Sequence, residues 1–131
     1  MEIIVTAWAL DSYLDLKHRG TFTANDYNQI IRPDVLKLKR YPNDPSFLNG
    51  KFWSPATDLG GPIPGDFKMK WHNLGYRLIQ LRLPIGMFSN AVLCHAYVKT
   101  DSKFEQRQLA KFKTRLELIR RGQYTECGRL I

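Results

Sequence analysis

The residues FKMKWHNLGYRL, positions 67–78, constrain the fold of this chain most strongly. Apolar and basic residues alternate ahead of an Asn/Gly turn, and consecutive side chains of a strand point to opposite faces of a sheet. The apolar side chains are therefore predicted to face a core, and Lys68 and Lys70 to face away from it. Arg77 follows the turn and is predicted to reach the same face as the two lysines. The segment thus predicts a hairpin with concentrated positive charge, which attracts an anion such as a phosphate.

The positive charge of the chain lies in its C-terminal half. The 131 residues are predicted to form one domain, 1–131. Residues 1–65 have seven basic and seven acidic side chains, whereas residues 66–131 have thirteen basic and five acidic ones, which accounts for the net charge of +8. This asymmetry favours a polyanionic partner that binds the C-terminal half. The alternative is a solvated basic helix face.

The hydrophobic patterns predict an α+β domain. An N-terminal strand and two helices are expected to pack on an antiparallel β-sheet, with a C-terminal helix after it. Pro33 is expected either to kink the second helix or to begin a further one. A turn is expected at Pro84-Ile85-Gly86. In chain order, the expected elements are a strand (2–5), a helix (6–17), a helical segment (23–42), a loop (42–66), a three-stranded meander (67–99) and a helix (103–121).

Several patterns argue against metal binding, membrane insertion and secretion. The two cysteines, Cys94 and Cys127, lack the CxxC or Cys/His spacing of a zinc site. Cys94 lies in an apolar run and is predicted to be a buried, reduced core residue. No apolar stretch approaches the roughly 18–20 residues that span a membrane, and the first residues do not resemble a signal peptide. We expect a cytoplasmic protein without cofactor or metal.

Two motifs resemble those of a known family of bacterial toxins. Lys68-Met69-Lys70 followed by Gly75-Tyr76-Arg77-Leu78 matches the spacing found on the central strands of the RelE/ParE superfamily, the toxins of type II toxin–antitoxin systems. The later segment LCHAYVK, residues 93–99, resembles the phage-type subgroup of the RelE/HigB-like branch. Ala110 and Arg115 follow on the next helix, as spaced Ala and Arg residues do in that subgroup. The resemblance covers the order of elements and implies a RelE-like toxin domain.

The resemblance implies a metal-independent mRNA endoribonuclease that inhibits translation. In this family the ribose 2′-hydroxyl attacks the adjacent phosphate and the 5′-oxygen leaves. The implied partners are mRNA, the ribosome with its rRNA, and a cognate antitoxin protein. The alternatives are a ParE-like inhibitor of DNA gyrase and a non-catalytic basic RNA-binding module.

The chemistry of RNA cleavage suggests roles for the cations of the hairpin. Lys68 and Lys70 are predicted to depress each other's pKa, which moves one lysine towards general-base duty and leaves charge for the phosphorane. Arg77 suits a bidentate phosphate clamp. By itself, an exposed Lys-x-Lys on a strand is more often a device for solubility or edge protection.

The segment 93–99 supplies the other predicted catalytic residues. His95 is a candidate proton donor to the leaving oxygen, and Tyr97 is a candidate to stack on a base or to orient the phosphate. Lys99 is predicted to contact a phosphate. Strand alternation leaves open whether His95 and Tyr97 face the core instead. Some RelE-like toxins have a catalytic tyrosine beyond the last strand, but residues 100–106 contain none.

The final helix is predicted to position the protein on RNA without recognising sequence. The predicted RNA-binding residues are Lys103, Arg107, Lys111 and Arg115. The alternative is that they form the exposed side of a helix packed on the core.

Overall fold

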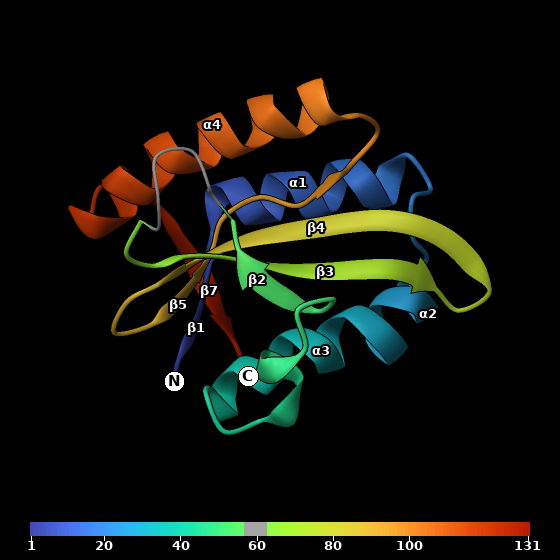
Figure 1. Ribbon diagram of the computed structural model, residues 1–131, viewed down its shortest axis with the longest axis horizontal. Coiled ribbons are helices and arrows are strands. Elements are labelled where there is room, and N and C mark those ends of the chain that lie inside the picture. Colours follow the sequence, from blue (N-terminus) through green and yellow to red (C-terminus); the bar gives the residue numbers. More distant parts are fainter. Residues whose placement is uncertain (57–62) are drawn as a thin grey trace.

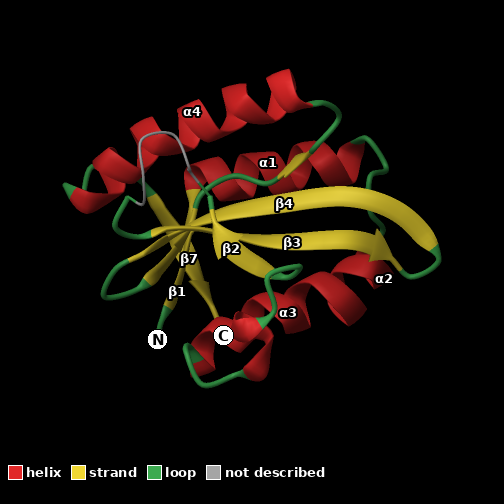
Figure 2. Cartoon of the chain, in the orientation of Figure 1, coloured by secondary structure: helices red, strands yellow, loops and turns green. Residues whose placement is uncertain are grey.

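The chain folds as a twisted β-sheet with helices on both sides (Figure 1). The computed structural model describes residues 1–56 and 63–131. Figure 2 shows the long helices above the sheet and a shorter helical segment below it. The elements are β1 (Ile3–Thr6), α1 (Ala7–His18), α2 (Ala24–Asp26), α3 (Arg32–Leu36), β2 (Trp53–Pro55), β3 (Asp66–Leu74), β4 (Arg77–Met87), β5 (Ala91–Leu93), β6 (Tyr97–Val98), α4 (Ser102–Arg120) and β7 (Glu126–Leu130).

The sheet is mixed, and the prediction of a purely antiparallel sheet is wrong. Its strand order is β2-β3-β4-β5-β1-β7, and β6 pairs with β4. β1 pairs with β5 in parallel, with Ile4 opposite Val92, while the other described pairs are antiparallel. β1 lies between β5 and β7, and it is antiparallel to β7. The predicted α+β class is confirmed.

The N-terminal helices begin as the sequence predicts. The Thr6 hydroxyl accepts a hydrogen bond from the Ala9 backbone N–H at 3.1 Å and caps α1. Thr23 and Asp26 form a reciprocal capping box, with both side chain–backbone distances at 3.0 Å. Pro33 interrupts the helical segment as predicted, because a π-helical turn, Tyr27–Ile31, precedes it and α3 begins beside it.

The β3–β4 hairpin separates an apolar face from a polar one. Phe67, Met69 and Trp71 pair across the strands with Ile85, Leu83 and Leu81. This face packs against α3, and the Trp71 indole N–H donates to Asp34 at 2.8 Å. α4 covers the opposite face: a Cβ atom added to Gly86 would lie 3.3 Å from Leu116. The lysines of β3 therefore lie on the side of the sheet that faces α4.

Four details of the predicted element order need correction. The segment Pro84-Ile85-Gly86, where a turn was expected, lies inside β4. On one side of β4 the paired strand changes here from β6 to β5, so neither of these two strand pairs needs a hydrogen bond from the N–H group that proline lacks. The expected loop 42–66 contains β2 and a 3₁₀ turn, and its residues 57–62 lie outside the described part of the chain. The third strand is split into β5 and β6. The exposed strand β7 was not predicted.

The described residues, 1–56 and 63–131, contain no helix that combines the length and apolar character needed to cross a membrane.

Candidate functional site

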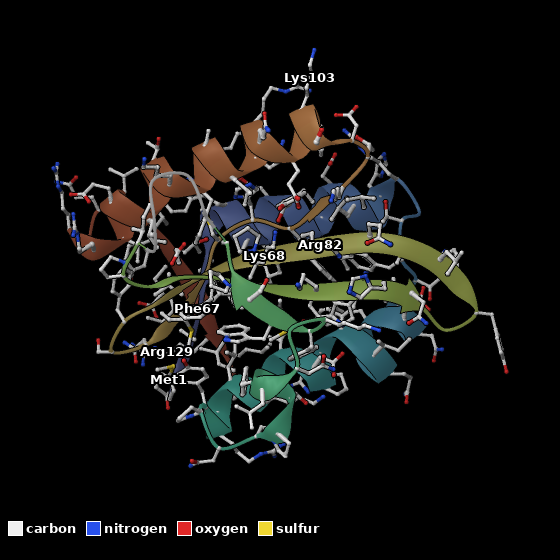
Figure 3. The ribbon with its side chains drawn as sticks, in the orientation of Figure 1. Met1, Phe67, Lys68, Arg82, Lys103 and Arg129 are labelled. Atoms are coloured by element: carbon white, nitrogen blue, oxygen red, sulfur yellow. The ribbon has the colours of Figure 1, made fainter. Side chains whose placement is uncertain are left out.

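A row of polar side chains crosses three strands on the face of the sheet under α4. Lys70 of β3 lies opposite Arg82 of β4, and Arg82 lies opposite Tyr97 of β6. Lys68 lies two residues earlier on β3 and therefore on the same face. Figure 3 shows Lys68 and Arg82 close together on the strands, beneath the first turns of α4. Strand pairing thus brings together residues that are separated by up to 29 positions.

The carboxylate of Glu105, from the first turns of α4, lies among these cations. Its Oε2 is 3.7 Å from the Lys68 Nζ, and its Oε1 is 3.6 Å from the Lys99 Nζ. The Tyr97 hydroxyl donates a hydrogen bond to Oε2 at 2.9 Å. We call the residues Lys68, Lys70, Arg82, Tyr97, Lys99 and Glu105 the cation cluster. With all its cations protonated, the cation cluster has three positive charges in excess of its carboxylate.

Burial differs across the cation cluster. The Lys68 and Glu105 side chains are each 13% exposed, whereas Lys99 is 40% exposed. Arg82 and Tyr97 are buried. The Arg82 guanidinium donates to the carbonyls of Leu81 and Trp71 and to the Gln80 side chain. Lys70 donates to the Gly50 carbonyl. An anion from solvent would meet Lys99 and Lys70 before the deeper members of the cation cluster.

Burial and neighbouring charge shift the pKa values in the cation cluster. Burial is the largest cause that lowers the pKa of Lys68, and the charges of Arg82 and Lys99 lower it further, although Glu105 opposes them. The pKa of Lys70 is lowered by burial first and then by the charge of Lys68. The pKa of both lysines is lowered, as predicted, but burial is the main cause. Lys68 lowers the pKa of Lys70, whereas the charges that lower the pKa of Lys68 are those of Arg82 and Lys99. Both amines release a proton more readily than an exposed lysine.

The carboxyl and phenol groups shift in opposite directions. Burial raises the pKa of Glu105, but the hydrogen bond from Tyr97 and the charges of Lys68, Lys99 and Arg82 outweigh it, so the net pKa is lowered. Burial and the bond to Glu105 raise the pKa of Tyr97. At neutral pH the cation cluster therefore holds a carboxylate beside a phenol that keeps its proton.

The structure places Arg77 outside the cation cluster, which corrects the prediction that it shares a face with Lys68 and Lys70. The pairing register shifts between Trp71 and Asn73, and Arg77 has the strand parity of the apolar residues of β4. Its guanidinium donates to the Thr21 carbonyl at 2.7 Å and to Asp26 at 3.1 Å. It therefore holds the hairpin against α2 and the residues that precede this helix.

His95 is buried behind Tyr97 and bonded at both ring nitrogens. Its Nε2 lies 3.2 Å from Gln108 Oε1, and its Nδ1 lies 3.3 Å from the Cys94 sulfur. Burial, and then the charges of Arg115 and Lys111, lower the pKa of His95 to about 4. Burial also raises the pKa of Cys94 to about 12, so the thiol stays protonated and can donate to Nδ1. A neutral, fully bonded imidazole gives no support to the predicted role of His95 as proton donor.

The burial of neutral His95 predicts a specific pH dependence of stability. In the unfolded chain the imidazole has its ordinary pKa near 6.5, so between about pH 4 and 6.5 the unfolded state binds more protons and stability falls as the pH falls. Between about pH 7 and pH 5, the free energy of unfolding measured in urea should fall by about 2 kcal/mol more for wild type than for His95→Gln. Equal losses in the two proteins would contradict the buried neutral state.

The predicted RNA-binding residues of α4 lie in different surroundings. Lys103 is exposed and points away from the sheet (Figure 3). Arg107 is exposed and its guanidinium lies 5.9 Å from the centroid of the Phe104 ring. Arg115 lies 5.0 Å from the Trp8 ring centroid and joins α4 to α1. Lys111 is exposed and lines a groove described below. Arg115 therefore packs between two helices, whereas Lys103, Arg107 and Lys111 are exposed to solvent.

Sequence reasoning missed two members of the cation cluster, Arg82 and Glu105. Arg82 interrupts the apolar run LIQLRLPIG of β4, and an isolated charge in such a run is a signal for a buried ionic site. Glu105 gave no such signal, because an acidic residue in the first turns of a helix is common.

Comparison of the chain with protein-family models, with curated proteins and with solved structures gives no match. Within residues 1–56 and 63–131, no group of three or more His, Cys, Asp or Glu side chains is placed to hold a metal ion.

Proposed function

We propose that this protein is a metal-independent endoribonuclease that acts on mRNA. The observation that carries the proposal is the cation cluster, in which three basic strand residues and Lys99 lie around the carboxylate of Glu105 at one end of α4. Converging cations on a sheet face fit the negative charge that develops on a phosphorane. The charge excess of the C-terminal half fits a polyanionic substrate.

The proposed reaction uses a lysine base and a phenol donor. The unprotonated Lys68 amine takes the proton of the ribose 2′-hydroxyl while the 2′-oxygen attacks the adjacent phosphorus. The bond from phosphorus to the 5′-oxygen breaks, and the Tyr97 hydroxyl hydrogen-bonds to that oxygen and donates its proton. The products are a 2′,3′-cyclic phosphate and a 5′-hydroxyl end. Lys68 then returns the proton to Tyr97 through solvent, which restores both groups.

Arg82, Lys70 and Lys99 have an electrostatic role in this proposal. Their charges hold the phosphate and stabilise the phosphorane, and Arg82 is fixed by its bonds to backbone carbonyls. Glu105 acts as the counter-ion of the free protein, because its carboxylate lies where Lys68 and Lys99 would receive a phosphate. Substrate phosphate takes its place.

The wider setting of the proposal comes from the family resemblance. We propose a RelE/HigB-like toxin that acts on ribosome-bound mRNA in the cytoplasm and is silenced by a cognate antitoxin. The motifs Lys68-Met69-Lys70 and Gly75-Tyr76-Arg77-Leu78 support this reading. However, Arg77 contributes to the attachment of the hairpin and not to the cation cluster.

A lysine base predicts a rate that increases with pH. Because the pKa of Lys68 is lowered, the fraction of free amine grows as the pH rises towards that pKa. Cleavage by wild type should therefore accelerate between about pH 6 and about pH 9 under single-turnover conditions. A rate that is flat over this range would rule out Lys68 as the base.

The proposal is tested by analysing RNA ends after incubation with purified protein. Free single-stranded RNA is tested in EDTA, whereas mRNA on translating ribosomes is tested in a buffer that contains Mg²⁺, because ribosomes dissociate without it. The Lys70→Met/Lys99→Met double variant, purified identically, controls for contaminating nucleases in both assays. We expect new 2′,3′-cyclic phosphate ends with wild type alone. Binding of RNA without cleavage of either substrate would favour a non-catalytic RNA-binding module, and inhibition of DNA supercoiling instead would favour a gyrase inhibitor.

A further inference from the structure

A groove of about 700 Å³ opens next to the cation cluster. It lies between the last turn of α1, the start of β4, strand β6 and the first half of α4. Tyr97 belongs to both features: its residue lines the groove, while its hydroxyl bonds to Glu105 in the cation cluster. A ligand in the groove would therefore lie one side chain away from a phosphate in the cation cluster.

Aromatic surface is available in the groove. Phe104 lines it and is half-buried, with its ring centroid 6.3 Å from that of Tyr97. Aromatic side chains offer nucleobases a stacking surface that does not depend on base identity. The volume of the groove falls within the roughly 300–1,000 Å³ of sites that bind small molecules, so the groove has room for a nucleoside.

Gln108 adds a positioned hydrogen-bond donor to the same groove. Because Cys94 can donate to Nδ1 of neutral His95, the proton of His95 lies on Nε2 and is donated to Gln108 Oε1. The amide nitrogen of Gln108 then keeps both hydrogens for an acceptor elsewhere. Carbonyl oxygens and ring nitrogens of nucleobases are such acceptors. His95 is thus a positioning residue for the amide.

Positive charge at the groove suits a nucleic acid more than an apolar ligand. Lys111 lines the wall formed by α4 and is exposed. Arg77 and Arg19 line the opposite wall, where Asp26 and Asp15 partly balance them. Lys111 is therefore the cation best placed to meet the next phosphate of a strand.

We infer that the groove binds the nucleoside attached to the phosphate in the cation cluster, with its base on Phe104 and hydrogen-bonded by Gln108. The inference rests on the proposed function only in placing a phosphate in the cation cluster. In this inference Lys111, which the sequence predicts to bind RNA, contacts a flanking phosphate. His95 positions the Gln108 amide and transfers no proton.

The test measures how much a base adds to affinity. The probes are a 2′-O-methyl uridine dinucleotide, which cannot be cleaved, and its two analogues with one base removed, titrated by calorimetry. For wild type we expect removal of one of the two bases to weaken binding about tenfold. Phe104→Leu and Gln108→Ala should lose this difference, whereas the matched variant Gln106→Ala, exposed on the same helix, should keep it.

The outcomes separate the groove from the nuclease. Equal binding of the intact and both abasic probes to wild type would overturn the inference, even if the protein cleaves RNA. A base-dependent difference that survives in both Phe104→Leu and Gln108→Ala would overturn it as well. If the affinity difference between the intact and abasic probes disappears in both variants while their thermal unfolding is unchanged, the groove is the binding site of the base, even if no RNA is cleaved. The role of Lys111 is tested by measuring the affinity for a trinucleotide, which has an additional phosphate. We expect weaker binding for Lys111→Gln and unchanged binding for the control Lys113→Gln.

Discussion

Lys68→Met should lower the rate of RNA cleavage about a thousandfold. The variant removes the proposed base, and general acid–base catalysis contributes roughly 10²–10⁴. The same amine, once protonated, also stabilises the phosphorane, and effects that act as a unit do not multiply. Methionine keeps the length of the lysine stem, so the contacts under α4 are retained. Single-turnover cleavage of a labelled RNA measures the effect.

The same variant should be no less stable than wild type. Lys68 is 13% exposed and its pKa is lowered mainly by burial, so the charge is held in an unfavourable environment. The charges of Arg82 and Lys99 disfavour the protonated Lys68 amine, and both remain in the variant to balance the Glu105 carboxylate. Glu105 retains Tyr97 and Lys99 as partners. Lost activity with unchanged or higher melting temperature would therefore separate a chemical role from misfolding.

Lys113→Met is the matched control for this prediction. Lys113 lies on the exposed side of α4 and does not belong to the cation cluster, so the net charge changes equally but the cleavage rate should not. If Lys68→Met retained more than about a hundredth of the wild-type rate, the loss would be too small for a base, whose contribution is at least about a hundredfold.

Four of the six residues of the cation cluster were predictable from the alternation of residues along strands. Lys68 and Lys70 could be assigned to one face from strand parity alone, and Tyr97 and Lys99 came from the next apolar strand. The helix ends were also predictable, since Thr6 and the Thr23–Asp26 pair are local capping signals. Local rules of this kind depend on neighbouring residues only.

The remaining features depend on contacts between distant segments. Arg77 was assigned to the wrong face because the register shift after Trp71 is a property of the paired strands and not of one strand. Glu105 reaches the cation cluster only because α4 crosses the sheet above β3. β7 contains exposed residues without alternating hydrophobicity, and it forms a strand because β1 offers it a free edge. Local sequence has no signal for these three features.

Glu105→Gln should increase affinity for RNA while it reduces stability. The carboxylate competes with a phosphate for Lys68 and Lys99, so its removal should strengthen binding of a 2′-O-methyl RNA oligonucleotide about tenfold, or about 1.4 kcal/mol. Glutamine preserves the shape of the side chain and still accepts the hydrogen bond of Tyr97. Equilibrium titration at fixed salt concentration measures the change.

The matched control is Glu117→Gln on the same helix. Glu117 pairs with Arg120 and Arg121 at the surface, so this variant removes the same charge away from the cation cluster. Its affinity for the oligonucleotide should change less than about twofold, because exposed charges are screened. If Glu105→Gln bound RNA no more tightly than Glu117→Gln, the carboxylate would not occupy the phosphate position.

The loss of stability in Glu105→Gln should itself depend on pH and on phosphate. Without Glu105, Lys68 loses the charge that opposes the lowering of its pKa, so the folded state favours the neutral amine more strongly than in wild type. The unfolded chain, with an ordinary lysine, binds more protons, so the stability lost by the variant should shrink as the pH rises towards the ordinary lysine value. Inorganic phosphate should restore stability at neutral pH in proportion to RT ln(1 + [phosphate]/Kd), because it supplies the missing counter-ion. A stability loss that neither higher pH nor phosphate reduces would show that Glu105 acts through packing and not through its charge.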